Sequence, residues 1–144
     1  MSSEMRVEVL TPGRPVATVK AHGVSLPGTL GYMGILPGHA SLVSELDAGE
    51  LHIDKVDGGE NLHYFLSGGY VEVHADKVTV LADVIESHSQ IDVKRAEAAR
   101  DRALGRLAGN AGGPVDADRA QNALKRAEAR LLFCKVLASV AHGH

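Results

Sequence analysis

Four arginines in the last third of the chain are the residues whose types and spacing most clearly suggest chemistry. Arg95 and Arg102 are seven positions apart, and Arg126 and Arg130 are four apart. If both segments are helical, each pair lies on one face of its helix, because an α-helix repeats every 3.6 residues. A planar guanidinium group can bind two phosphate oxygens at once. Four such groups on one patch would form a binding site for a polyanion.

The same four arginines also fit a plainer interpretation. A helical face exposed to water often carries basic residues, and carboxylates at Glu97, Asp101 and Glu128 would neutralise them. If the chain folds back near Gly112, residues whose numbers sum to roughly 224 lie opposite each other, which brings all four arginines together. Geometry alone favours the solvated face, and the polyanion site remains the alternative.

No catalytic or metal-binding motif accompanies the arginines. The chain lacks a GxxxxGK[ST] phosphate loop, a GxSxG elbow and an HExxH pair, and its eight histidines are scattered. The single cysteine, Cys134, falls on an apolar helical seam, which favours a small core residue over a nucleophile. Ser67-Gly68-Gly69 is better explained by a bulge or sheet corner than by an anion cradle. We expect neither catalysis nor a bound metal.

The arginines belong to two predicted helices. The segment 91–108 is rich in the helix formers Ala, Arg, Leu and Glu, and Ser89 with Asp92 suggests a capping box at its start. A Gly- and Pro-rich breaker covers 109–114, and a second helix is predicted from the N-cap Asp116 to Ala141. Its apolar positions alternate in steps of four and three, as in a coiled coil: Ala120, Leu124, Ala127, Leu131, Cys134, Ala138 and Ala141.

The first of these helices offers a matching stripe of small side chains. Its members are Ala96, Ala99, Ala103 and Leu107. A short connection between two such helices predicts an antiparallel hairpin. Alanine lets the two backbones approach closely but buries little apolar area, so we expect a hairpin of modest stability that can move.

The first part of the chain is predicted to be β-structure. Short apolar or alternating runs recur at 6–10, 17–21, 34–36, 41–46, 50–56, 62–67, 70–74 and 77–82. Turn signals separate them at 11–13, 27–28, 37–38, 57–59 and 75–76. Many short strands at close spacing are typical of an all-β sandwich or barrel.

Composition and charge narrow the function further. Aromatic residues make up 3% of the 144-residue chain and tryptophan is missing, which disfavours base-stacking and carbohydrate-binding surfaces. One cysteine, no long apolar run and a polar start without signal or transit character predict a protein of the cytoplasm. Residues 1–87 contain five basic and twelve acidic residues, whereas residues 88–144 contain ten and six. We therefore expect two domains, 1–87 and 88–144, with different working surfaces.

Five segments, in order, carry a resemblance to a known family. They read LTPG from Leu10, GYMGILPGHA from Gly31, LHYFLSGGY from Leu62, VTVLAD from Val78 and IDxxRA from Ile91. Together with the predicted layout, they resemble the epsilon subunits of bacterial F-type ATP synthases over nearly the whole chain.

The resemblance implies an α+β protein: an N-terminal ten-stranded β-sandwich or flattened barrel, followed by an antiparallel helical hairpin. It implies that the β domain binds the gamma subunit of the central stalk. It also implies that a loop with Gly31, Tyr32, Gly34, Pro37 and His39 contacts the membrane-embedded ring of c subunits. Relatives often carry an acidic residue where Tyr32 stands and a proline where Ser41 stands, so a charge contact from position 32 to the ring is in doubt.

The family's hairpin is a switch that permits rotation when folded and brakes ATP hydrolysis when extended into the catalytic alpha/beta head. In several bacterial members the folded hairpin binds ATP. By correspondence with those members, the ATP contacts here would be Glu86, Ile91, Asp92, Arg95, Ala96, Arg102, Arg126 and Arg130. No cofactor is required on this view, and ATP is a regulatory ligand.

The function implied is that of a non-catalytic rotor subunit, which couples proton flow to ATP synthesis. Its place would be the cytoplasmic face of the bacterial inner membrane, held there peripherally and only through the complex, with no nucleic-acid partner. One alternative is a stand-alone nucleotide- or RNA-binding adaptor that uses the arginine-rich hairpin. A structural β-domain with an inert tail is the other.

Overall fold

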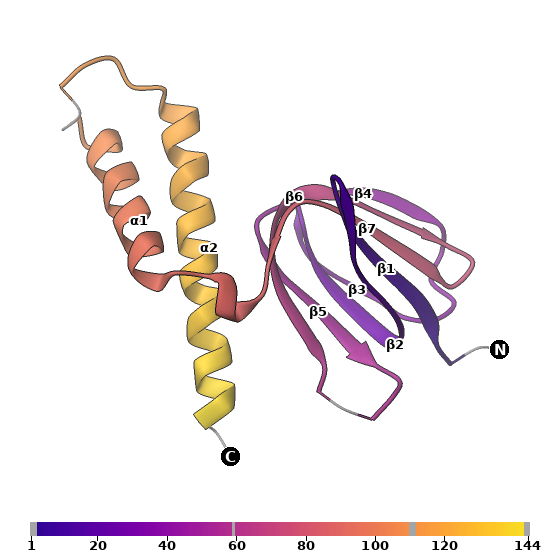
Figure 1. Ribbon diagram of the computed structural model, residues 1–144. Coiled ribbons are helices and arrows are strands. Elements are labelled where there is room, and N and C mark those ends of the chain that lie inside the picture. Colours follow the sequence, from indigo (N-terminus) through magenta and orange to yellow (C-terminus); the bar gives the residue numbers. More distant parts are fainter. Residues whose placement is uncertain (1–2, 59, 110–111, 143–144) are drawn as a thin grey trace. The chain divides into compact units, whose positions relative to one another are not determined.

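The computed structural model describes residues 3–58, 60–109 and 112–142, with side chains up to residue 137. The chain divides into two compact units, Met1–Ser87 and His88–His144. The first unit consists of strands and the second of helices, as Figure 1 shows.

The first unit contains seven strands in its described residues. They are β1 (Met5–Thr11), β2 (Arg14–Gly28), β3 (Gly31–Ile35), β4 (Leu42–Leu46), β5 (Gly49–Lys55), β6 (Leu62–His74) and β7 (Lys77–Glu86). They join in the order β1-β7-β6-β4-β2-β3, and β5 pairs with both β2 and β6. Because β1 also pairs with β2, the sheet closes on itself, and β1–β7 is its parallel pairing. This confirms the predicted sandwich or flattened barrel.

The core of this unit lies between the two walls of the closed sheet. Alternate side chains of each strand point inward, as in β1, where Met5, Val7 and Val9 are fully or almost fully buried. The same alternation buries Val71 and Val73 of β6, and Val78 and Val80 of β7. All members of this core cluster belong to the strands of the first unit.

The implied count of ten strands is wrong: the described residues of the first unit form seven, and one of these joins two runs that were predicted separately. The runs 62–67 and 70–74 form one strand, β6, although Gly68 and Gly69 lie between them. Both glycines have positive φ, 77° and 122°, so the chain changes direction without leaving its partner β7. Strand β2 is 15 residues long, longer than its predicted run 17–21, and continues through a register shift between Ala21 and Gly23.

Several predicted turns are confirmed. Pro12 and Gly13 connect β1 to β2, and Gly13 has the positive φ of 95° that a turn with Pro followed by Gly requires. Ala75 and Asp76 connect β6 to β7 with φ of 49° and 60°. The turn predicted at Pro27-Gly28 is wrong by two residues: Pro27 pairs with Tyr32 inside the β2–β3 ladder, and the connection lies at 29–30.

The second unit contains a short 3₁₀ helix, η1 (His88–Gln90), and two α-helices, α1 (Val93–Leu107) and α2 (Ala117–His142). Helix α1 starts at Asp92, whose Oδ1 accepts a hydrogen bond from the Arg95 amide at 3.1 Å. The predicted cap at Ser89 is therefore wrong, because 88–90 forms its own 3₁₀ turn. Helix α2 has the predicted N-cap: Asp116 Oδ1 accepts from the Arg119 amide at 3.1 Å.

The two helices pack along most of the predicted small-residue seam, but Leu107, which was predicted on it, is 37% exposed. Ala96 and Ala103 of α1 are buried, as are Ala120 and Ala127 of α2. Each pair is seven residues apart, so the buried positions recur after two turns on both helices. Cys134 is 7% exposed on the same stripe of α2, in agreement with its prediction as a core residue. The seam positions Ala138 and Ala141 lie outside the described side chains.

Candidate functional site

The four arginines of the predicted polyanion site all lie on the helical hairpin. Arg95 and Arg102 are exposed on α1, Arg126 is exposed on α2, and Arg130 is half-buried there. Each residue of a helix is rotated by about 100° from the previous one. On each helix the mean direction of the arginines lies about 90–100° from that of the buried alanines, in the same rotational sense. In an antiparallel pair, this places the two arginine stripes on one side of the hairpin.

The carboxylates that were expected to neutralise this face do not do so. Asp101 forms an ion pair with Arg100, at 3.2 Å, and not with one of the four arginines. In the described part of the chain, Arg95, Arg102 and Arg126 make no side-chain ion pair or hydrogen bond. Three guanidinium groups are thus open to an external anion, which favours the polyanion interpretation over the neutralised face.

The remaining predicted ATP contacts lie in three places: before α1, in its first turn and at the end of β7. Ile91 and Asp92 come directly before α1, where the Ile91 amide donates to the His88 carbonyl at 3.3 Å. One oxygen of Asp92 is occupied by the helix cap. Ala96 is only 5% exposed and faces the seam, and its amide already donates to the Asp92 carbonyl at 3.0 Å. Glu86 is the last residue of β7 and belongs to the first unit.

The predicted ring-contact residues run from β3 into the turn that follows it. Gly31, Tyr32 and Gly34 belong to β3, and the Tyr32 hydroxyl accepts a hydrogen bond from the Glu50 amide at 2.9 Å. The next turn, through Pro37 and Gly38, is closed by the His39 amide bonding to the Leu36 carbonyl at 3.1 Å.

The segment from Leu30 to Gly38 is anchored by a hydrogen bond but presents apolar side chains. The Gly38 amide donates to Asp76 Oδ1 at 2.7 Å, which ties the loop to the β6–β7 turn. Leu30, Tyr32 and Leu36 are 104%, 62% and 64% exposed. A surface of this kind can pack against another protein with little charge.

A second apolar surface occupies part of the outer face of the sheet. Tyr70 of β6 is 54% exposed and pairs with Leu81 of β7, which is 48% exposed. Leu81 in turn pairs with Leu10 of β1, and Tyr70 pairs with Glu45 of β4. We call Leu10, Tyr70 and Leu81 the apolar row. Neighbouring residues on three strands share one face, so the row is continuous.

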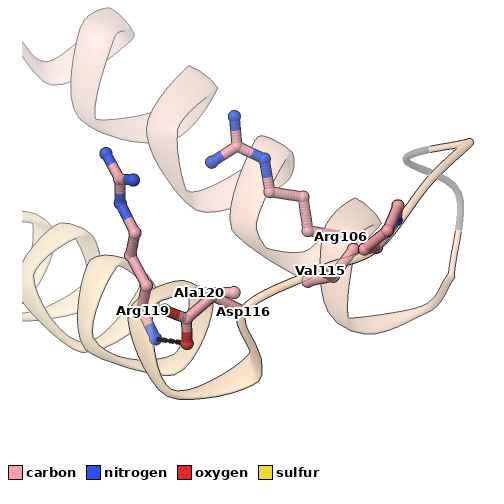
Figure 2. Close-up of a pocket in the computed structure, with 6 residues that line it drawn as sticks. Arg106, Val115, Asp116, Arg119 and Ala120 are labelled. Atoms are coloured by element: carbon pink, nitrogen blue, oxygen red, sulfur yellow. Dashed lines mark hydrogen bonds between the residues drawn. The ribbon is translucent and has the colours of Figure 1, made fainter.

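A cavity that was not predicted from the sequence lies at the connection between α1 and α2. Figure 2 shows Arg106 and Arg119 with their guanidinium groups on the same side of the two helices. The cavity has a volume of about 330 Å³ and is lined by Arg106, Pro114, Val115, Asp116, Arg119 and Ala120. The sequence spacing does indicate that these two arginines share a face with the predicted ones: Arg106 follows Arg102 by four residues, and Arg119 precedes Arg126 by seven.

The described residues contain neither a candidate metal site nor a candidate membrane-spanning helix. No group of three His, Cys, Asp or Glu side chains suited to a metal ion occurs in residues 3–58, 60–109 and 112–137. Among the helices described, none has the length and apolar character needed to cross a membrane.

Comparison with protein-family models matches both units of the chain. The β-sandwich domain of the ATP synthase delta/epsilon chain matches residues 4–88. The long α-helix domain of the same chain matches residues 89–132. The two models follow each other in the order of the two units.

Individual proteins are similar along most of the chain. An ATP synthase epsilon chain from Desulforamulus reducens is 40% identical over 131 residues, which are 91% of this chain and 97% of that one. One from Solibacter usitatus is 42% identical over 131 residues, with 91% and 96% covered.

Solved structures show the same fold. A chain of the Euglena gracilis mitochondrial ATP synthase, in its OSCP/F1/c-ring part, has a TM-score of 0.78 at 19% identity and covers 99% of this chain and 84% of its own. A chain from the central stalk and c-ring of the Tetrahymena thermophila mitochondrial enzyme has a TM-score of 0.56 at 19% identity, with 92% and 95% covered.

Proposed function

Because the chain belongs to the ATP synthase delta/epsilon chain family, we propose that it is a non-catalytic rotor subunit of the central stalk of an F-type ATP synthase. The observation that carries this proposal is the match of both units, in order, to the two domains of one family. Relatives that share 40% of the aligned residues over nine-tenths of the chain are named epsilon chains. The alternative of a stand-alone nucleotide- or RNA-binding adaptor finds no support in these relatives.

The β unit is the part we assign to the gamma subunit and the c-ring. A closed sheet with a fully buried core is stiff, and a part that transmits torque must be stiff. The apolar row offers a surface for gamma, since Tyr70 and Leu81 are large, apolar and about half exposed.

The loop through Gly31, Tyr32, Gly34, Pro37 and His39 is the part we assign to the ring. Position 32 carries a tyrosine and no carboxylate, and its hydroxyl already accepts a hydrogen bond from the Glu50 amide within the chain. Its contact with the ring would therefore be made by the apolar part of the side chain. The bond between Gly38 and Asp76 gives the loop the fixed shape that a repeated contact needs.

The hairpin is the part we assign to regulation by ATP and to docking on the alpha/beta head. Support comes from the open guanidinium groups of Arg95, Arg102 and Arg126, which have no partner among the described residues. The basic balance of residues 88–144 also favours an acidic partner surface. ATP would stabilise whichever hairpin state binds it, by about 2.7 kcal/mol at a ligand concentration one hundred times Kd.

The complex containing this subunit would lie at the cytoplasmic face of a bacterial inner membrane. The similar epsilon chains from Desulforamulus reducens and Solibacter usitatus are bacterial proteins. A chain whose described helices cannot cross a membrane would be held there through its partners.

Co-purification tests the rotor assignment directly. The full chain is co-expressed with the gamma subunit of the same organism, and complex formation is measured after affinity capture of gamma. We expect a one-to-one complex, weakened at least tenfold by Leu81→Asp on the apolar row. The matched control is Asp54→Asn on β5, an exposed position outside the row. Failure of the unmodified chain to bind gamma would contradict the assignment.

A further inference from the structure

The arginine face of the hairpin is longer than the four predicted residues. Arg95, Arg102 and Arg106 of α1 fall within about 40° of rotation, and so do Arg119, Arg126 and Arg130 of α2. On α1 this face is about 16 Å long. Arg106 and Arg119 extend it to the connection between the helices, where the cavity lies.

The cavity at that end has the components of an oxyanion site. Arg106 approaches it from the last turn of α1 and Arg119 from the first turn of α2. Figure 2 shows their guanidinium groups as two separate groups with space between them. In the described residues neither group makes an ion pair or a side-chain hydrogen bond. Two donor forks that line the same cavity and have no partner in the described residues suit an anion with several oxygens.

The one acidic lining residue, Asp116, does not occupy the guanidinium groups. Its Oδ1 accepts the hydrogen bond from the backbone amide of Arg119 at 3.1 Å, as the cap of α2. The site therefore relies on side chains of both helices, and the helix end itself is already capped. With two positive charges and one negative charge, the lining keeps a net positive charge for an anion.

We propose that the cavity between Arg106 and Arg119 binds a phosphate group, at a site separate from the predicted ATP contacts. The group can belong to free inorganic phosphate or to a nucleotide, and both present the same tetrahedral oxygens. The inference does not depend on the rotor role, because it rests on this cavity alone.

Binding is tested by NMR on the isolated full chain labelled with ¹⁵N. Inorganic phosphate is titrated at constant ionic strength held with NaCl, and the arginine Nε–Hε signals are followed. We expect saturable shifts of Arg106 and Arg119. The Arg100 signal should stay in place, because Asp101 already engages that guanidinium. Equal shifts of all arginines, or no saturation up to about 50 mM phosphate, would overturn the proposal.

Variants make the test specific. Arg106→Gln and Arg119→Gln should each weaken phosphate binding about tenfold, whereas Arg100→Gln should leave it unchanged. Asp116→Asn keeps a capping side chain but removes the negative charge, so phosphate should bind a few-fold more tightly. Circular dichroism checks that each variant remains helical. Unchanged affinity in both glutamine variants would overturn the proposal.

A further variant separates this cavity from the predicted ATP site. Arg126→Ala should retain the phosphate shifts of Arg106 and Arg119, and loss of those shifts would overturn a separate site. In the same variant, ATP that shifts the two signals at lower concentration than phosphate would identify a nucleotide as the source of the group. A response to inorganic phosphate alone would identify the free ion. A failed co-purification with gamma would leave all these results standing.

Discussion

At the scale of single residues, Gly69 is the described glycine of the β unit with the least room for a side chain. A Cβ atom there would overlap the backbone carbonyl oxygen of Leu81 on the neighbouring strand, and φ is 122°. We expect Gly69→Ala to lower the free energy of unfolding by about 3 kcal/mol or more, measured by urea denaturation.

The control for this prediction is Gly34→Ala. A Cβ at Gly34 meets no atom within 4 Å, and its φ is not in the left-handed region. Stability should change there by less than about 1 kcal/mol. Equal stability of the two variants would contradict the prediction, because it would show that position 69 accepts a side chain despite the close approach of β6 to β7.

Arg126 is the residue at which the ATP proposal is sharpest. It is exposed and has no partner in the described chain, so its loss removes ligand contacts without breaking the fold. We expect Arg126→Ala to weaken ATP binding to the isolated chain by about 10- to 100-fold in titration calorimetry. Arg100→Ala is the matched control, since Arg100 is bonded to Asp101. No heat at millimolar ATP with the unmodified chain would remove the ATP proposal and leave the rotor role intact.

At the scale of elements, the start of α2 depends on one side chain. Asp116 accepts the hydrogen bond of the Arg119 amide, which otherwise has no partner within the helix. Asp116→Ala should destabilise the hairpin by about 1 kcal/mol, whereas Asp116→Asn should have a small effect. Amide exchange of the first turn of α2 measures the difference. Equal exchange in both variants would show that the cap contributes little.

The hairpin as a whole should open more readily than the sheet. Its seam is built from Ala96, Ala103, Ala120 and Ala127, which bury few methyl groups per turn, whereas the β core contains Leu51, Ile53 and Leu66. We expect amides of α1 and α2 to exchange at least about tenfold faster than those of β6 and β7. Equal protection would contradict a hairpin that can change state.

At the scale of the whole molecule, the first unit should fold without the second. Every member of its core cluster lies between Met5 and Ala82. A chain that ends at Ser87 should therefore unfold cooperatively and still bind gamma. When reconstituted with the catalytic head, it should fail to inhibit ATP hydrolysis where the full chain inhibits.

The control for the truncation is the full chain measured in parallel, with ATP hydrolysis by the head alone as the baseline. Equal ATPase rates with full and shortened chains would favour an inert hairpin. Loss of gamma binding on truncation would contradict a stalk contact made by the β unit alone.

Much of the local structure could be predicted from the sequence, because it depends on neighbouring residues. Pro12-Gly13 and Ala75-Asp76 turn where expected, Asp116 caps α2, and the alanine seam follows the period of a helix. Each of these features involves residues within one or two turns of each other. The arginine spacing was equally visible, although Arg106 and Arg119 were overlooked.

The sequence alone therefore determined the order and type of the two units: strands with alternating apolar residues first, then two amphipathic helices with arginines on one face. Only the tertiary structure decided that β6 passes through Gly68 and Gly69 as one strand, because that depends on its ladder with β7. It also decided that Asp101 binds Arg100, and that Arg106 and Arg119 line the same cavity. These outcomes depend on which partners meet in space, and one-dimensional spacing does not specify them.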